Sequence, residues 1–251
     1  MRLWNKLMAA ALLMAPMAAQ AVPADVAAAV AVDARPADAV KLDESRRPVQ
    51  VLGFLGLKKG DRALDLFTGG GYYAEIMGGA VGPDGRVVAW EPTNFHDATA
   101  QVRWEALATR VGNAELLVSP ADAISLPRDS FDFVLMHMIY HDFYWQSEEY
   151  KFPRVDPAAV LAEVFAATKP GGIVGVVDHA ANPGGDTRAV VEKLHRIDPA
   201  VLRADFERAG FVFDGESDLL RNPEDDHSRL VFDPAIRGRT DRVVYRFRKP
   251  E

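Results

Sequence analysis

The sequence predicts an α/β protein: a mostly parallel seven-stranded sheet with helices on both faces and a C-terminal antiparallel β-hairpin. The first observation is the segment 62–73, in which an apolar run is followed by Gly69, Gly70 and Gly71 and then by a helical pattern. That order is typical of a buried parallel strand, a tight turn and a helix start. The second observation is the alternation of strand and helix patterns along most of the chain, which favours a parallel sheet.

Each element has its own pattern in the sequence. Apolar residues at helical spacing over 49–55 predict a helix before the first strand, and the segment 58–61 closes it. Later helices are predicted over 72–77, 97–110, 156–167 and 198–209. The last two begin with an Asp-Pro pair, a capping acid before a proline at the first helical position. Strands are predicted over 63–67, 86–90, 115–118, 131–136, 173–177, 211–213 and 243–247.

The end of the chain breaks the alternation. No clear helix separates the strands predicted over 211–213 and 243–247, which suggests that they pair antiparallel at the end of the sheet. Because crossovers between parallel strands are right-handed, the carboxyl ends of the parallel strands should share one edge. In open α/β sheets ligands bind at that edge, and the glycine turn lies there.

Length and composition narrow the class of protein. The chain has 251 residues, enough for one sizeable domain, and its 49% hydrophobic and 26% charged content is ordinary for a globular protein. The net charge of −7 disfavours a nucleic-acid surface. The sequence contains no cysteine, which excludes disulfides, thiol nucleophiles and cysteine metal sites.

The N-terminus has the anatomy of a secretory signal peptide. Two basic residues, Arg2 and Lys6, precede an apolar stretch over 7–18 and a small-residue cleavage site at 19–21. We therefore expect a signal peptide over 1–21, a flexible or loosely helical lead-in over 22–41 and one domain over 42–251. The predicted location is the periplasm or the medium, with no membrane association after cleavage; an uncleaved anchor is the alternative.

A set of motifs between Arg46 and Pro250 carries a family resemblance. They are the segments 54–61, 69–73, 140–142, 169–172, 178–179, 194–197 and 240–242. On these motifs the chain resembles class I S-adenosylmethionine-dependent methyltransferases, and more closely the predicted periplasmic methyltransferase-like proteins of bacteria. The resemblance implies a Rossmann-like methyltransferase fold, S-adenosyl-L-methionine as cofactor and methyl transfer to an unidentified, small-molecule acceptor. The oligomeric state is left open.

The resemblance also points to cofactor-binding residues. It implies that Asp65 binds the methionine amino group and that Asp122 holds the adenine amino group. Glu91 ends the second strand about twenty residues after the glycine turn, where an acid accepts hydrogen bonds from ribose hydroxyls. The residues expected to let the chain pass beneath the cofactor are Gly69, Gly70 and Gly71.

One position departs from the family's pattern of three alternating glycines. Phe67 stands at the first of the three, with Gly69 and Gly71 at the others. Two interpretations follow: the Phe67 ring narrows the cofactor site, or it packs beneath that site.

The segment 136–145 after the fourth strand is expected to face the acceptor. It offers His141 as a base, Asp142 as its orienting acid, and aromatic walls suited to a sulfonium or a planar substrate. Asp178-His179 ends the fifth strand at the same edge. The predicted catalytic residues are Tyr140, His141, Asp142 and His179.

Other functions compete with this interpretation. His141, Asp142, Asp178 and His179 could instead bind a metal ion, but no metal-ligand spacing is present, so no metal site is predicted. The export signal and Phe67 leave open a non-catalytic or repurposed methyltransferase-fold protein that binds an adenosyl or other small ligand. A nicotinamide-dependent oxidoreductase is a weaker alternative, resting on the loose glycine pattern over 69–74. The long segment 216–239 is expected to cover part of the substrate pocket.

Overall fold

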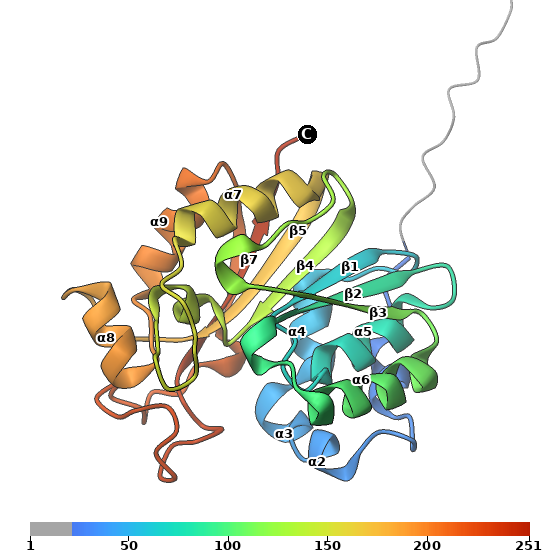
Figure 1. Ribbon diagram of the computed structural model, residues 1–251, viewed down its shortest axis with the longest axis horizontal. Helices are drawn as coiled ribbons and strands as arrows, with labels where there is room; N and C mark the ends of the chain where they lie inside the picture. Colours follow the sequence, from blue (N-terminus) through green and yellow to red (C-terminus); the bar gives the residue numbers. More distant parts are fainter. Residues whose placement is uncertain (1–21) are drawn as a thin grey trace, which may run out of the picture.

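The computed structural model describes residues 22–251, so the predicted signal peptide over 1–21 lies outside the described residues. One seven-stranded sheet runs through this part of the chain, in the order β3-β2-β1-β4-β5-β7-β6 (Figure 1). Its strands are β1 (Arg62–Leu66), β2 (Arg86–Pro92), β3 (Ala114–Ser119), β4 (Phe131–His137), β5 (Thr168–His179), β6 (Val212–Ser217) and β7 (Arg242–Arg248). The strand order and the mixed sheet confirm the predicted fold class.

Helices precede and connect these strands. The α-helices are α1 (Val26–Val30), α2 (Ala37–Val40), α3 (Asp43–Arg46), α4 (Pro48–Leu55), α5 (Tyr72–Val81), α6 (Ala98–Val111), α7 (Pro157–Ala167), α8 (Thr187–Leu194) and α9 (Pro199–Arg208). The short 3₁₀ turns are η1 (Thr93–Phe95), η2 (Ala121–Ala123), η3 (Tyr140–Tyr144) and η4 (Asp218–Leu220). Among the helices described between residues 22 and 251, none combines the length and the apolar character needed to cross a bilayer.

The hydrophobic core forms two layers, one on each face of the sheet. On one face, α7 and α9 pack over the sheet through Leu161, Val164 and Phe206. On the other, α1, α4 and α5 pack against it through residues such as Leu52 and Ile76. The sheet is therefore covered by helices on both faces, as Figure 1 shows.

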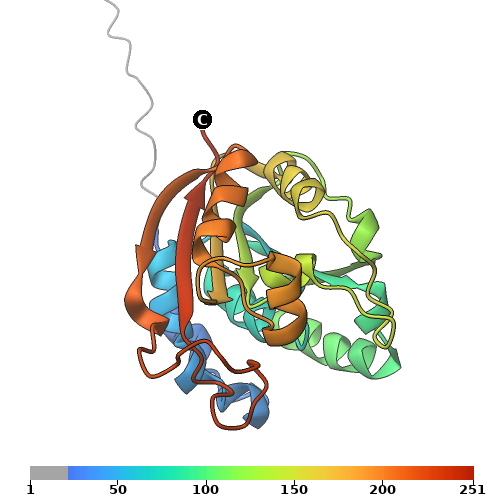
Figure 2. The ribbon, with the colours of Figure 1, turned by 90° about the vertical axis from the view of Figure 1, so that its left-hand side faces the viewer.

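The pairing brings the functional ends of the strands together. Strands β1 to β5 are parallel, whereas β7 runs antiparallel to both β5 and β6. Arg242, the first residue of β7, pairs with His179, the last residue of β5. The start of β7 thus lies at the same edge as the carboxyl ends of the parallel strands, and Figure 2 shows β6 and β7 (orange and red) along one side of the sheet.

Two elements differ from the sequence prediction. The segment 169–172 was expected to separate a helix from a strand, but β5 begins at Thr168 directly after α7. The reason is backbone pairing, because Thr168 aligns with Phe131, the Gly171 amide donates to the Lys249 carbonyl, and the Lys249 amide donates to the Gly172 carbonyl. Helix α8 was not predicted, although Asp186 caps it as in the helices that were predicted.

The lead-in over 22–41 is occupied by short helices. Val26 and Ala29 of α1 are buried against α5, and Ala29 lies against Gly79, where an added Cβ would come within 3.1 Å. Arg35 follows, and its guanidinium forms an ion pair with Asp43 of α3 at 2.8 Å. These contacts hold α2 and α3 beside the carboxyl end of β1.

Candidate active site

A cavity of about 780 Å³ lies at the carboxyl end of β1, between the sheet and the N-terminal helices. That volume falls within the range of about 300–1,000 Å³ typical of small-molecule sites. The sheet side of its lining is Asp65, Phe67, Thr68, Gly69, Gly70, His137, Met138 and Ile139. The opposite side is formed by residues of α2, α3, α5 and α6, among them Leu42, Arg46, Tyr73 and Arg103.

Asp65 supplies a buried carboxylate to this cavity. It is 3% exposed, and the Thr68 hydroxyl donates a 2.6 Å hydrogen bond to it. Burial raises the pKa of Asp65 to about 6, so the side chain is ionised above mildly acidic pH and carries little hydration. A buried anion of this kind favours a cationic partner such as an ammonium group.

Arg46 brings the opposite charge to the same cavity. Its guanidinium lies over the Tyr72 ring, 4.4 Å from the centroid, and burial lowers its pKa. Among the ion pairs of the described residues, none involves Arg46. The cavity therefore presents a carboxylate and a free guanidinium together, a pairing that suits a zwitterionic amino-acid group.

The glycine turn joins β1 to α5 in a backbone conformation that favours glycine. Gly69 has φ of 56°, and its amide donates a 2.8 Å hydrogen bond to Glu91 at the end of β2. Gly71 has φ of 78° and caps α5, and an added Cβ there would lie 2.4 Å from Leu107. Gly70 lines the cavity beside Gly69. The turn is thus fixed from both sides, with the Gly69 and Gly70 backbone facing the cavity.

Glu91 is placed differently from Asp65. It is 4% exposed and lines a separate small cleft with Gly69 and Gly70, of about 10 Å³. Burial raises the pKa of Glu91 to about 8. Its observed contact is the Gly69 amide, so this acid holds the glycine turn, and its assignment to ribose hydroxyls stays a prediction.

The Phe67 ring packs against other aromatic rings and also lines the cavity, so both interpretations drawn from the sequence apply to it. Its ring stacks on Phe152 at 6.1 Å and meets Phe95 at 5.4 Å and Trp90 at 6.0 Å. It also lines the cavity. Its φ is 63°, the left-handed region in which glycine is favoured. The backbone therefore adopts a left-handed conformation that favours glycine, while the side chain packs beneath the cavity.

Two predicted site residues lie away from the cavity. Asp122, in η2, is exposed and lines neither the cavity nor the small cleft. Tyr140 is fully buried in the core layer under α7 and α9, where its hydroxyl donates a 2.7 Å hydrogen bond to Asp205. The structure therefore does not support the predicted catalytic role of Tyr140, because η3 turns its ring away from the edge.

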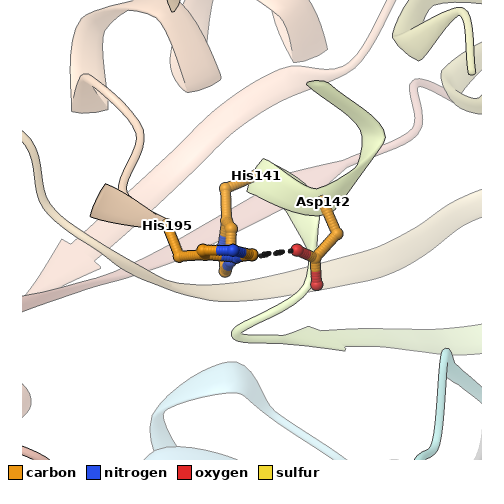
Figure 3. A group of neighbouring side chains, drawn as sticks. All are labelled: His141, Asp142 and His195. Atoms are coloured by element: carbon orange, nitrogen blue, oxygen red, sulfur yellow. Dashed lines mark ion pairs between the residues drawn. The ribbon is translucent and has the colours of Figure 1, made fainter. Parts of the chain in front are cut away.

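His141 and Asp142 point instead toward a neighbouring cluster. The Nδ1 of His141 bonds to Asp178 Oδ1 at 2.7 Å, and its Nε2 lies 3.3 Å from Asp142 Oδ1. The same Asp142 oxygen lies 3.4 Å from Nδ1 of His195 (Figure 3). Burial lowers the pKa of His141, but the carboxylates of Asp142 and Asp178 outweigh burial and raise it to about 9. The role of His141 as a base stays a prediction.

Neutral imidazoles come from two other histidines. The Nδ1 of His179 bonds to Thr240 Oγ1 at 2.7 Å, and burial holds the pKa of His179 well below its usual value. His137 ends β4 and lines the cavity, and burial also lowers its pKa well below the usual value. Its Nε2 is buried with no hydrogen-bond partner among the described residues. His137 was not selected from the sequence, although its place at the end of β4 was an available signal.

The segment 216–239 does not line the cavity. The buried Arg196 forms an ion pair with Asp225 at 2.9 Å, and His227 Nε2 bonds to Asp241 at 2.9 Å. These contacts hold the segment against the edge formed by β5 and β7. The wall of this cavity opposite the sheet is formed by α2, α3 and their neighbours instead, and covering of the substrate pocket by the segment stays a prediction.

The fold and this site define an α/β protein with a ligand cavity at the glycine turn of a class I methyltransferase sheet. A family model described as a methyltransferase domain matches residues 64–176. The predicted resemblance to class I S-adenosylmethionine-dependent methyltransferases is thereby confirmed, and the cofactor that this family implies is S-adenosyl-L-methionine.

Similar proteins agree with this class. The chain is 29% identical over 124 residues to demethylmenaquinone methyltransferase of Geobacillus kaustophilus, and the match covers 49% of this chain and 47% of the relative. The chain thus spans about half the length of that curated relative. A SAM-dependent methyltransferase structure from Aquifex aeolicus shares the fold, with a TM-score of 0.56, 22% identity and coverage of 85% of this chain and 98% of the other. A SAM-dependent methyltransferase structure from Mesorhizobium loti also shares the fold, with a TM-score of 0.55, 18% identity and coverage of 83% of this chain and 100% of the other.

The residues of the cavity fit the amino-acid end of S-adenosylmethionine. Asp65 and Arg46 match its ammonium and carboxylate, and the Gly69 and Gly70 backbone leaves room beside them. His137 also lines this cavity, and its Nε2 is buried without a hydrogen-bond partner among the described residues. These groups all belong to the chain itself, and they line a cavity at the strand ends, where the sequence predicted a ligand site.

Proposed function

We propose that the protein is an S-adenosylmethionine-dependent methyltransferase that acts on a small-molecule acceptor. The observation that carries the proposal is the joint presence of Asp65 and Arg46 in one cavity at the glycine turn. When bound, the cofactor supplies a methyl group on a positively charged sulfur. Because that methyl group is already activated, the chain has to bind, align and desolvate the reactants.

His137 is the residue of this chain best placed to handle the acceptor. It lines the cavity, it is neutral at physiological pH, and its Nε2 lacks a partner among the described residues. A neutral imidazole can accept a hydrogen bond from an acceptor hydroxyl or amine and orient its lone pair. His137 is thus a candidate beside His141, whose predicted role as a base is retained.

Calorimetric titration with S-adenosylhomocysteine tests the cofactor site directly. We expect micromolar binding to the wild-type protein and a loss of at least about tenfold in Asp65→Asn, since an amide cannot balance the ammonium charge. Asp38→Asn serves as control, because Asp38 also lines the cavity but is exposed. An unchanged affinity in Asp65→Asn would contradict the proposal.

A second candidate, an exported protein that keeps the fold without catalysis, is favoured by one observation. Glu91 bonds to the Gly69 amide and borders a cleft of only about 10 Å³, so the site beside it offers little room for a ribose. This candidate predicts that ligand binds but that no acceptor is methylated. Turnover on any small-molecule acceptor that is lost in Asp65→Asn supports the methyltransferase.

A further inference from the structure

The cluster of His141, Asp142 and His195 lies outside the cavity and has no role in the proposed function. One ligand atom from each residue lies within 4.8 Å of the others. His141 and Asp142 come from η3, and His195 is the C-cap of α8, so two separate segments contribute (Figure 3). We propose that this cluster is a binding site for a divalent transition-metal ion of the zinc type.

The spacing of the three ligand atoms matches metal coordination better than hydrogen bonding. Nε2 of His141 and Nδ1 of His195 lie 3.3 and 3.4 Å from the same Asp142 oxygen, beyond the range of about 2.7–3.2 Å for ordinary N–H···O bonds. Two ligands held about 2.1 Å from a tetrahedral zinc ion lie about 3.4 Å apart. Two of the three distances thus match the edges of a coordination tetrahedron, and the ligand atoms of His141 and His195 lie within 4.8 Å of each other.

His141 has the support that metal-binding histidines require. Its Nδ1 bonds to Asp178 Oδ1 at 2.7 Å, and its backbone amide bonds to the other oxygen of Asp178. Asp178 is completely buried, so the imidazole is fixed with Nε2 directed toward Asp142. A carboxylate behind the distal nitrogen sets the tautomer and ring orientation of a metal ligand.

His195 is held in place by its backbone and by two rings. Its φ is 48°, a left-handed conformation that non-glycine residues seldom adopt without a local reason. Trp145 and Phe232 each lie 5.1 Å from its ring centroid. His141 is buried, whereas the His195 and Asp142 side chains are 13% and 17% exposed, which leaves a route for an ion from that side.

The donor set indicates the class of ion. Two imidazole nitrogens and one carboxylate oxygen, with a fourth position open, are typical of zinc sites that keep a water or substrate ligand. The sequence predicted no metal site, because the three ligands have no recognisable spacing. They also differ from the set weighed there, since Asp178 supports His141 and His179 bonds to Thr240.

Titration of the chelator-treated protein with Zn²⁺ tests the site without any cofactor, so the result is independent of methyltransferase activity. We expect one equivalent to bind and the affinity to fall at least about tenfold in His195→Asn. Asparagine tolerates the left-handed backbone, so this variant should fold. The matched control is His227→Asn, because His227 also has a left-handed φ, of 64°, and lies outside the cluster.

Two further measurements distinguish the loss of a metal ligand from a loss of folding. Circular dichroism of metal-free His195→Asn shows whether it folds, and Asp142→Asn provides a second variant that should lose affinity. Visible absorption of bound Co²⁺ should be lost in both variants and retained in His227→Asn. Absence of saturable binding to the folded wild type, or equal affinity in wild type and His195→Asn, would show that the cluster is a hydrogen-bond network only.

Discussion

Phe67 shows how one residue keeps a backbone conformation while changing the surface around it. Its φ of 63° is that of a glycine turn, and its ring joins Trp90, Phe95 and Phe152 beneath the cavity. The aromatic contacts therefore compensate for a strained backbone, which costs about 1–2 kcal/mol for a residue with a Cβ.

This balance predicts an unusual order of stability at position 67. Both Phe67→Ala and Phe67→Gly lose the ring contacts, but only glycine relieves the backbone strain. We expect Phe67→Gly to exceed Phe67→Ala by about 1 kcal/mol in the free energy of unfolding by urea. At Phe95, whose φ is negative, alanine should be the more stable of the two. The same order at both positions would contradict the strain argument.

Asp65 shows how a binding residue reduces stability. Burial raises its pKa from 3.8 to about 6, so the folded state holds a proton that the unfolded chain releases between these values. Its contribution to stability is therefore complete below about pH 4 and is lost as the pH rises through about 6.

A comparison of unfolding at several pH values tests this sign. Between about pH 4 and pH 7 the free energy of unfolding of the wild type should fall by about 2 kcal/mol relative to Asp65→Asn, which does not titrate. Urea unfolding at each pH measures both proteins, so the titration of all other groups cancels in the difference. Parallel curves for the two proteins would show that Asp65 is not desolvated.

At the scale of elements, the N-terminal helices act as one wall of the cavity. Asp43 of α3 accepts hydrogen bonds from Arg35 and, at 2.6 Å, from the Tyr72 hydroxyl of α5. The Arg35 side chain is 1% exposed, so loss of Asp43 would leave a buried cation without its partner. The position of α2 and α3 therefore depends on this ion pair.

Limited trypsin digestion checks that dependence. Asp43→Ala should be cleaved at Lys41 and Arg46 at least about tenfold faster than wild type, the factor that a loss of about 1.4 kcal/mol of local stability produces. Asp33→Ala is the control, because Asp33 is exposed in the same segment. Equal cleavage of the two variants would mean that other contacts hold the wall.

The elements that the sequence predicted best are those with a local cause. The strand over 131–136 is apolar and short, and Asp156 and Asp198 cap their helices through side-chain bonds to Ala158 and Ala200. The start of β5 could not be predicted, since the Lys-Pro-Gly-Gly segment after Thr168 has the pattern of a turn but is held in the strand by pairing of Thr168 with Phe131 and by bonds to Lys249. Tertiary pairing overrides the local turn signal there.

For the whole molecule, the candidate site could be predicted only where it coincides with strand ends. Asp65 lies near the end of β1 and the glycine turn follows that strand, so the sequence could place both at this edge of the sheet. Arg46 reaches the same cavity from α3, and no local pattern sets it apart from the other arginines. Tyr140 and His141 are adjacent in sequence, but the turn of η3 sends one to the core and the other to the edge.

Because the sheet and the N-terminal helices both line the cavity, a ligand bound there should stabilise the chain as one unit. S-adenosylhomocysteine binds the folded state only, so each tenfold increase above its Kd adds about 1.4 kcal/mol, or about 3–5 °C in Tm for a domain of this size. We expect one calorimetric transition that shifts as a whole and does not shift in Asp65→Asn. Two transitions, of which one moves with ligand, would show that the helical wall unfolds separately and that the ligand contacts the sheet alone.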